Sequence, residues 1–306
     1  MPTDEHHDGA VHKLDDLAKS IAARAEHTLA TRTAQLEESK RLGPVVAGTK
    51  RFFEIEGLDL AGLLALELFT TVIPLVLIGY SWASDFSSNL SFGDFMIKWM
   101  DLKGQSASVV QGLFGTSASL RSTWTVLGLA GFLFWGIPMS SQVAKTYARA
   151  FRRERWPFWT EVWRGTAWFV LLLGTYVLTA VITSGHADGA GHWVFYTISL
   201  APGFVLWSIS PVILIRAGHA AWRHLAWCGL AGVVIGTIGS RLTLLVVFPK
   251  LLAGWVGFGP IGVAMAMMTT ASVIAVLWVV TAVLGAVLWE RNAPEHEVIA
   301  SQVALA

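Results

Sequence analysis

The chain has 306 residues, of which 54% are hydrophobic and 14% are charged. A soluble globular domain carries about 25% charged residues, so this composition excludes that class and predicts an integral membrane protein. The 15 tryptophans favour the same class, because Trp is enriched at membrane–water interfaces. Cys228 is the single cysteine, which excludes an intramolecular disulfide and a cysteine metal cluster.

Residues 1–57 form the only substantial soluble segment, which we expect to be helical and cytoplasmic. They begin with polar and acidic residues and lack the basic region and apolar core of a signal peptide, so we expect the first membrane helix to target the chain. Residues 11–42 contain no Pro or Gly and carry a narrow apolar stripe, and Gly43–Pro44 ends the predicted helix. Two interpretations are open: a solvated or membrane-surface helix, or a helix that docks a cytoplasmic partner.

Six apolar runs follow this segment, and a helix needs about 20 such residues to cross the hydrocarbon core of a bilayer. They predict an all-α, polytopic fold with six transmembrane helices. The membrane domain then covers residues 58–291, and residues 292–306 form a cytoplasmic tail. The predicted spans are residues 60–83, 124–143, 165–184, 193–215, 225–248 and 261–289.

The Lys and Arg residues predict the orientation of these helices, because cytoplasmic loops carry an excess of them. Of the 22 Lys and Arg, 17 fall in the N-terminal segment, in the loops at 145–164 and 216–224, and in the tail. This alternation is in phase with six spans and predicts that both termini are cytoplasmic. The few in the alternate loops are Lys98, Lys103, Arg121 and Lys250.

The first outer loop, residues 84–123, is too long for a simple turn. Within it, large apolar residues recur at helical spacing, which favours an interfacial helix on the outer leaflet. A short helix packed on the outer surface of the protein itself is the alternative. The residues concerned are Phe92, Phe95, Met96, Trp99 and Met100.

Glu67, Thr70, Thr71 and Pro74 interrupt the first span. Their spacing of i, i+3, i+4 and i+7 places them on one helix face. An ionisable group inside a membrane usually faces the protein interior or a water-filled cavity. This face is therefore the candidate polar pathway or binding site, in the inner half of the membrane; a buried carboxyl group that helps helices pack is the alternative.

Arg241 is the second intramembrane charge and the secondary candidate. Along their helices, Glu67 and Arg241 differ in depth by roughly 14 Å, which is more than two side chains normally bridge. We therefore expect Arg241 not to pair with Glu67. It should instead extend towards the outer headgroups or meet polar groups of the outer leaflet.

The same span carries a stripe of small residues that includes Gly232 and Gly236. Such stripes let helix backbones approach closely, so they predict tight packing within the chain or, as a partner hypothesis, a homo-oligomer. On an α-helix, Arg241 would lie about 140° around the axis from Gly236. The charge and the tight contact are therefore predicted on different faces.

Two polar loops are candidates for other chemistry. The stretch "KTYARAFRRERWPFW" mixes cations with aromatics, but between two spans it is explained by topology and anionic lipid, and we expect no nucleic-acid partner. The loop "GHADGAGH" offers His186, Asp188 and His192, which is a weak metal signal and favours a plain polar turn. No nucleophile motif, phosphate loop or zinc signature is present, so we expect no catalytic residue, no cofactor and no metal.

Four stretches resemble the YihY/BrkB family of bacterial inner-membrane proteins, once described as ribonuclease BN. They are "LLALELFTTVIPLVL", "FLFWGIPMSSQVAKTYARAF", "WRHLAWCGLAGVVIG" and "GFGPIGVAMAM" with the later "AVLGAVLWER". The resemblance lies in their order and spacing over residues 45–291. Thr71 and Pro74 fall on the Ser and Pro of the family's first span, whereas Glu67 stands where the family usually shows an aromatic.

The resemblance implies a multi-pass protein of the bacterial inner membrane that is linked to envelope integrity, with membrane lipids as partners. Some relatives are proposed as lipid or lipopolysaccharide transporters, which favours a transporter of a lipid or other amphiphile. The alternative is a non-transporting scaffold whose N-terminal helix docks a cytoplasmic partner. An intramembrane enzyme has the least support, because no acid–base or nucleophile pair is visible.

Overall fold

The computed structural model describes residues 42–86, 97, 103–114, 121–184, 192–219 and 221–294. The chain divides into two compact units, residues 1–50 and 51–306. In the first unit the described residues are 42–50, which open the helix α2 (Gly43–Glu54). The predictions for the aromatic residues Phe92, Phe95, Met96, Trp99 and Met100 and for His186 and Asp188 lie outside the described residues, as does the helix predicted over 11–42 except for its last residue.

The described part of the second unit is mostly helical. Within it, four helical stretches are long and apolar enough to cross a membrane, and they run over Phe158–Thr183, Tyr196–Leu214, Trp222–Trp255 and Ile261–Asn292. The chain is therefore an all-α protein with apolar helices of membrane-spanning length. Two further helices, α3 (Gly57–Phe86) and α6 (Arg121–Ala150), cover the first two predicted spans.

The remaining helices follow in chain order. A short helix, α5 (Gln105–Phe114), precedes α6. Between α6 and α13 the helices are α7 (Phe158–Ser184), α8 (His192–Ile198), α9 (Ala201–Leu214), α10 (Ala226–Ala231), α11 (Ser240–Leu242) and α12 (Phe248–Trp255). The last helix is α13 (Pro260–Asn292).

The predicted spans at 193–215 and 225–248 differ from the structure. The first is broken, because α8 ends at Ile198 and α9 begins at Ala201, with Pro202 in its first turn. A proline is favoured there because it lacks an N–H that the helix start leaves unpaired in any case. The second is a longer, irregular helix with π-helical segments at Gly232–Gly239 and Thr243–Val247.

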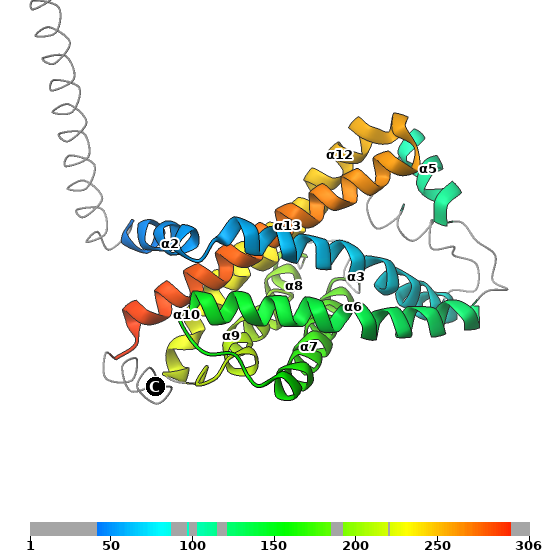
Figure 1. Cartoon of the computed structure of the whole chain (residues 1–306). Helices are drawn as coiled ribbons and strands as arrows, with labels where there is room; N and C mark the ends of the chain where they lie inside the picture. The colour runs from blue at the N-terminus through cyan, green and yellow to red at the C-terminus, as the bar shows by residue number, and fades with distance from the viewer. Residues whose placement is uncertain are drawn as a thin grey trace, which may run out of the picture. The chain divides into compact units, whose positions relative to one another are not determined.

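The helices of this unit pack in pairs along their lengths. Helix α3 lies beside both α6 and α13, and α7 lies beside α6 and α9 (Figure 1). Helix α10 packs between α9 and α13. A smaller apolar cluster around Phe248 and Leu252 joins α12 to the start of α13.

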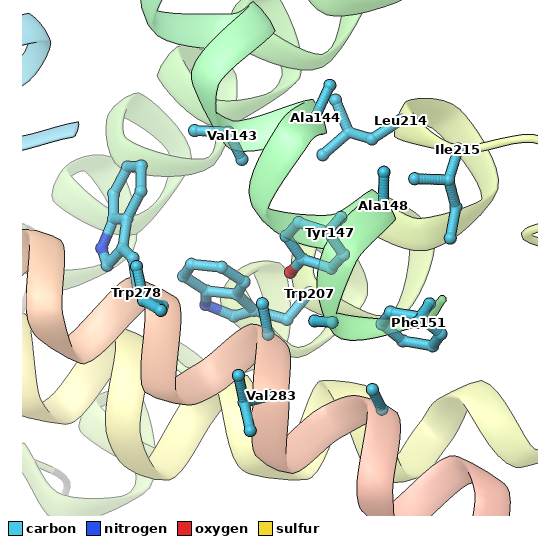
Figure 2. Packing of buried hydrophobic residues seen from close by; sticks show 14 of the residues in the cluster. Val143, Ala144, Tyr147, Ala148, Phe151, Trp207, Leu214, Ile215, Trp278 and Val283 are labelled. Atoms are coloured by element: carbon cyan, nitrogen blue, oxygen red, sulfur yellow. The ribbon is translucent and has the colours of Figure 1, made fainter. Parts of the chain in front are cut away.

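The main core lies where α6, α9 and α13 meet. Tyr147 of α6, Trp207 of α9 and Val283 of α13 lie close together there (Figure 2). Trp278 packs edge-on against Trp207, with ring centroids 5.6 Å apart. Aromatic side chains therefore supply much of the apolar area that this junction buries.

The tryptophans divide between this core and the surface. Trp168, Trp207, Trp278 and Trp289 are buried, so the interface location expected from composition does not hold for them. Each of the first three donates its indole N–H to a hydroxyl oxygen, on Ser210, Thr237 and Ser240 respectively. Because these indole N–H groups have acceptors, the three tryptophans are buried without the energetic cost of an unsatisfied hydrogen-bond donor.

The basic loop between α6 and α7 is held by specific contacts. Arg152, which has a positive φ of 51°, pairs with Glu54 at 2.8 Å. Arg149 pairs with Glu56 at 3.1 Å. Arg155 binds both Glu161 and Ser141. These cations therefore hold the loop against the end of α2, the turn before α3 and the start of α7.

Arg153 is the buried member of this loop. Its guanidinium lies over the Trp289 ring, 5.7 Å from the centroid. Burial lowers the pKa of Arg153, and the nearby Glu290 carboxylate offsets part of that effect. The ends of α6 and α13 therefore meet at one basic region.

Candidate functional site

The predicted polar face of α3 is used largely within its own helix. The hydroxyl of Thr71 is buried and donates to the carbonyl oxygen of Glu67 at 2.6 Å. Thr70 donates to the carbonyl oxygens of Leu66 at 3.0 Å and Glu67 at 3.1 Å. Neither hydroxyl donor is therefore left for a ligand, whereas the half-buried Glu67 carboxylate stays a candidate. Pro74 lies within the helical residues of α3.

The glycine stripe packs within the chain, which confirms the prediction of close helix approach. A methyl group on Gly236 would lie 2.5 Å from Cζ2 of Trp207, and one on Gly232 would overlap the same indole. On the facing helix, a methyl group on Gly203 would lie 2.7 Å from Oγ1 of Thr237. Trp207 therefore covers both Gly232 and Gly236 within the chain.

A small cavity lies where this irregular helix meets α7 and α9. Its volume is about 40 Å³, which is room for two or three water molecules. Leucines and Trp207 supply an apolar wall, and Arg241 supplies a cation. The lining residues are Leu172, Thr175, Tyr176, Thr179, Gly203, Leu206, Trp207, Gly236, Thr237, Ser240, Arg241 and Leu244.

Arg241 turns towards the break between α8 and α9. Its Nη1 donates a long hydrogen bond of 3.4 Å to the hydroxyl of Ser199. Its guanidinium lies over the ring of Tyr196, 5.4 Å from the centroid. The prediction that Arg241 meets polar groups, rather than Glu67, agrees with these contacts.

The break itself is a polar element in an otherwise apolar run. The hydroxyl of Ser199, which is buried, donates to the carbonyl oxygen of Tyr196 at 2.7 Å. Thr179 of α7 donates to the carbonyl oxygen of Ser199 at 3.4 Å. Backbone groups freed by a helix break inside a membrane need such partners, and breaks of this kind are tolerated beside a cavity.

The placement of Arg241 and Gly236 on different faces was wrong, because both line the cavity. The angle of about 140° assumes α-helical winding. The residues from Gly232 to Gly239 are π-helical, and in a π-helix the hydrogen bond joins residues five apart. Gly236 lies within this irregular segment and Arg241 just after it, so the α-helical angle does not hold between them.

Sequence reasoning missed most of the cavity wall. Ser199 and Tyr196, which contact Arg241 beside the cavity, were counted within a continuous span, although Pro202 is a start signal for a new helix. Trp207 and Thr237 carry no motif at all, and only the packing of α9 on the glycine stripe brings them to the cavity. Arg241 is the one predicted site residue that the cavity includes.

In the part of the chain that the structure describes, no group of three His, Cys, Asp or Glu side chains is placed to hold a metal ion. The chain matches no protein-family model, no curated protein and no solved structure. The cavity around Arg241 is therefore assigned from its own geometry and chemistry.

Proposed function

We propose that this protein binds and moves a lipid or other amphiphile in the bacterial inner membrane, in support of envelope integrity. In this proposal six helices cross the bilayer and both termini are cytoplasmic. The observation that carries it is the cavity between α7, α9 and the irregular helix, where apolar walls and one cation occur together. An amphiphile has the matching pair of features, an apolar body and a polar head.

The irregular backbone around the cavity supports the same proposal. A broken α8–α9 pair and a π-helical segment flank Arg241. Discontinuous helices form substrate sites in many transporters, and π-helical turns occur frequently at functional sites. The resemblance to the YihY/BrkB family, which no comparison supports, points to the same class of function.

Reconstituted protein tests the proposal. In liposomes that contain a phospholipid with a fluorescent headgroup, a membrane-impermeant quencher reports movement between leaflets. We expect wild type to accelerate this movement and Thr175→Phe to abolish most of the acceleration, because Thr175 lines the cavity. Val177→Phe is the matched control, because Val177 is on the same helix and 63% exposed.

Two results would contradict transport. One is wild-type protein that leaves lipid movement at the rate of empty liposomes. The other is acceleration that survives Thr175→Phe. The first result would favour the scaffold, which a pull-down with and without residues 1–42 then tests directly.

A further inference from the structure

We infer that Arg241 binds the anionic oxygen atoms of a phosphate or carboxylate group, and that the cavity is the seat of that group. This inference rests on the proposed function and names the charged part of the ligand.

The first argument for an anion site is electrostatic, because Arg241 has no counterion among the residues that the structure describes. Arg241 lies within a candidate membrane span, where ionisable side chains usually pair with one another or mark a ligand pathway. Its contacts, the Ser199 hydroxyl and the Tyr196 ring, are both uncharged. Among the residues that the structure describes, no carboxylate forms an ion pair with it; the pairs involve Arg51, Arg149, Arg152, Arg155 and Arg216.

The geometry leaves the guanidinium ready to bind an anion. A guanidinium has five N–H donors in a planar fork, and the fork matches two oxygens of a carboxylate or phosphate. The hydrogen bond to Ser199, at 3.4 Å, is at the long limit and uses one donor. Among the residues that the structure describes, no acidic side chain lines the cavity, so its described wall would not repel an anion.

The size of the cavity limits which part of a ligand it takes. A volume of about 40 Å³ suits a small charged group and not a whole lipid. Acyl chains would have to lie outside, where Val181 of α7 and Val205 of α9 are exposed. The anion can therefore come from a lipid headgroup or from a free ion, and these two sources need separate tests.

The test compares ligands on purified full-length protein in detergent. The probes are phosphatidylglycerol, zwitterionic phosphatidylcholine and inorganic phosphate, with binding followed by native mass spectrometry and by tryptophan fluorescence. We expect phosphatidylglycerol to bind at least tenfold more tightly than phosphatidylcholine. We expect Arg241→Gln to remove this preference and Arg241→Lys, which keeps the charge but loses the fork, to retain part of it.

The phosphate arm separates the two sources. If phosphate displaces phosphatidylglycerol from wild type and not from Arg241→Gln, a free anion is sufficient for the site. If phosphatidylglycerol binds with the Arg241-dependent preference and phosphate does not compete, the headgroup must arrive with its lipid. Either result supports the inference, because both depend on Arg241.

Equal binding of the two lipids by wild type, or an unchanged preference in Arg241→Gln, would overturn the inference. Should Arg241→Gln fail to fold, Thr175→Phe and its matched control Val177→Phe replace it. Thr175→Phe fills the cavity and should abolish the preference; Val177→Phe changes an exposed position of the same helix, keeps the cavity and the charge, and should preserve the preference. If the protein prefers the anionic lipid but does not move lipid, only the transport proposal is contradicted. If it moves lipid but shows no preference for the anionic lipid, only this inference is contradicted.

Discussion

Arg51 and Glu290 form a bidentate ion pair, with an Nη2–Oε2 distance of 2.7 Å and an Nη1–Oε1 distance of 3.1 Å. The same guanidinium donates to the carbonyl oxygen of Ala150 at 2.7 Å. Residue 51 lies in the last turn of α2, residue 290 lies near the end of α13, and residue 150 ends α6. The buried guanidinium of Arg51 therefore connects the ends of α2, α6 and α13, which are far apart in the sequence.

Removing this cation should destabilise the fold. Arg51→Met leaves the largely buried Glu290 carboxylate without its partner, and we expect the free energy of unfolding to fall by about 3 kcal/mol. Thermal unfolding in detergent, followed by size-exclusion chromatography, would measure the loss. Arg216→Met is the matched control, because its pair with Glu154 is exposed on both sides and is expected to contribute less than about 1 kcal/mol. Equal losses in the two variants would contradict this assignment.

The contact between the glycine stripe and Trp207 predicts a second stability difference. Gly232→Ala puts a methyl group into the indole, so α9 or the side chain must shift, at a cost of about 1–3 kcal/mol. Gly174→Ala is the control within a helix, because a methyl group there meets nothing within 4 Å. We expect it to be neutral or slightly stabilising, since Ala is the better helix former. A Gly232→Ala variant as stable as wild type would show that Trp207 does not cover the stripe.

Arg164 caps the end of α9, which predicts sensitivity to a charge-conserving change. Its Nε and Nη2 donate to the carbonyl oxygens of Ile213 at 2.7 Å and Val212 at 2.8 Å. Its guanidinium also lies over Trp156. Lysine cannot donate in the same planar fork, so Arg164→Lys should lower the unfolding free energy by about 1–2 kcal/mol.

The control for that experiment is Arg223→Lys. Arg223 also lies over a tryptophan, Trp222, but it is exposed and no carbonyl hydrogen bond is found for it among the described contacts. We expect this variant to unfold like wild type. If both lysine variants lose the same stability, the stacking on tryptophan and not the capping of α9 is the cause.

The proposed orientation predicts which positions a membrane-impermeant maleimide reaches. Cys228 is buried, so wild type should react only after unfolding. In a Cys228→Ser background, Gly112→Cys on α5 should be labelled in intact cells, and His219→Cys should be labelled only in inverted membrane vesicles. Both native residues are exposed. Labelling of the two positions from the same side would contradict six spans with both termini in the cytoplasm.

The sequence by itself determined the class of the protein and the presence of its helices. Long apolar runs with few charges favour helices that cross a membrane. In the bilayer an unpaired backbone N–H or C=O group is costly, and a helix pairs these groups within itself. The sequence also indicated the close approach at Gly232 and Gly236, since small residues permit it in any such helix. These features depend only on neighbours along the chain.

The tertiary structure decided where polar groups meet. The α-helical period placed Arg241 away from Gly236, whereas in the irregular helix both residues line one cavity. The broken α8–α9 pair sets Ser199 and Tyr196 beside that arginine. Conversely, the threonines of the predicted α3 face bind carbonyls of their own helix. A periodic sequence pattern predicts the face on which a residue lies only where the helix is regular. The packing of α9 against the glycine stripe decides which side chains line the cavity, among them Trp207 and Thr237.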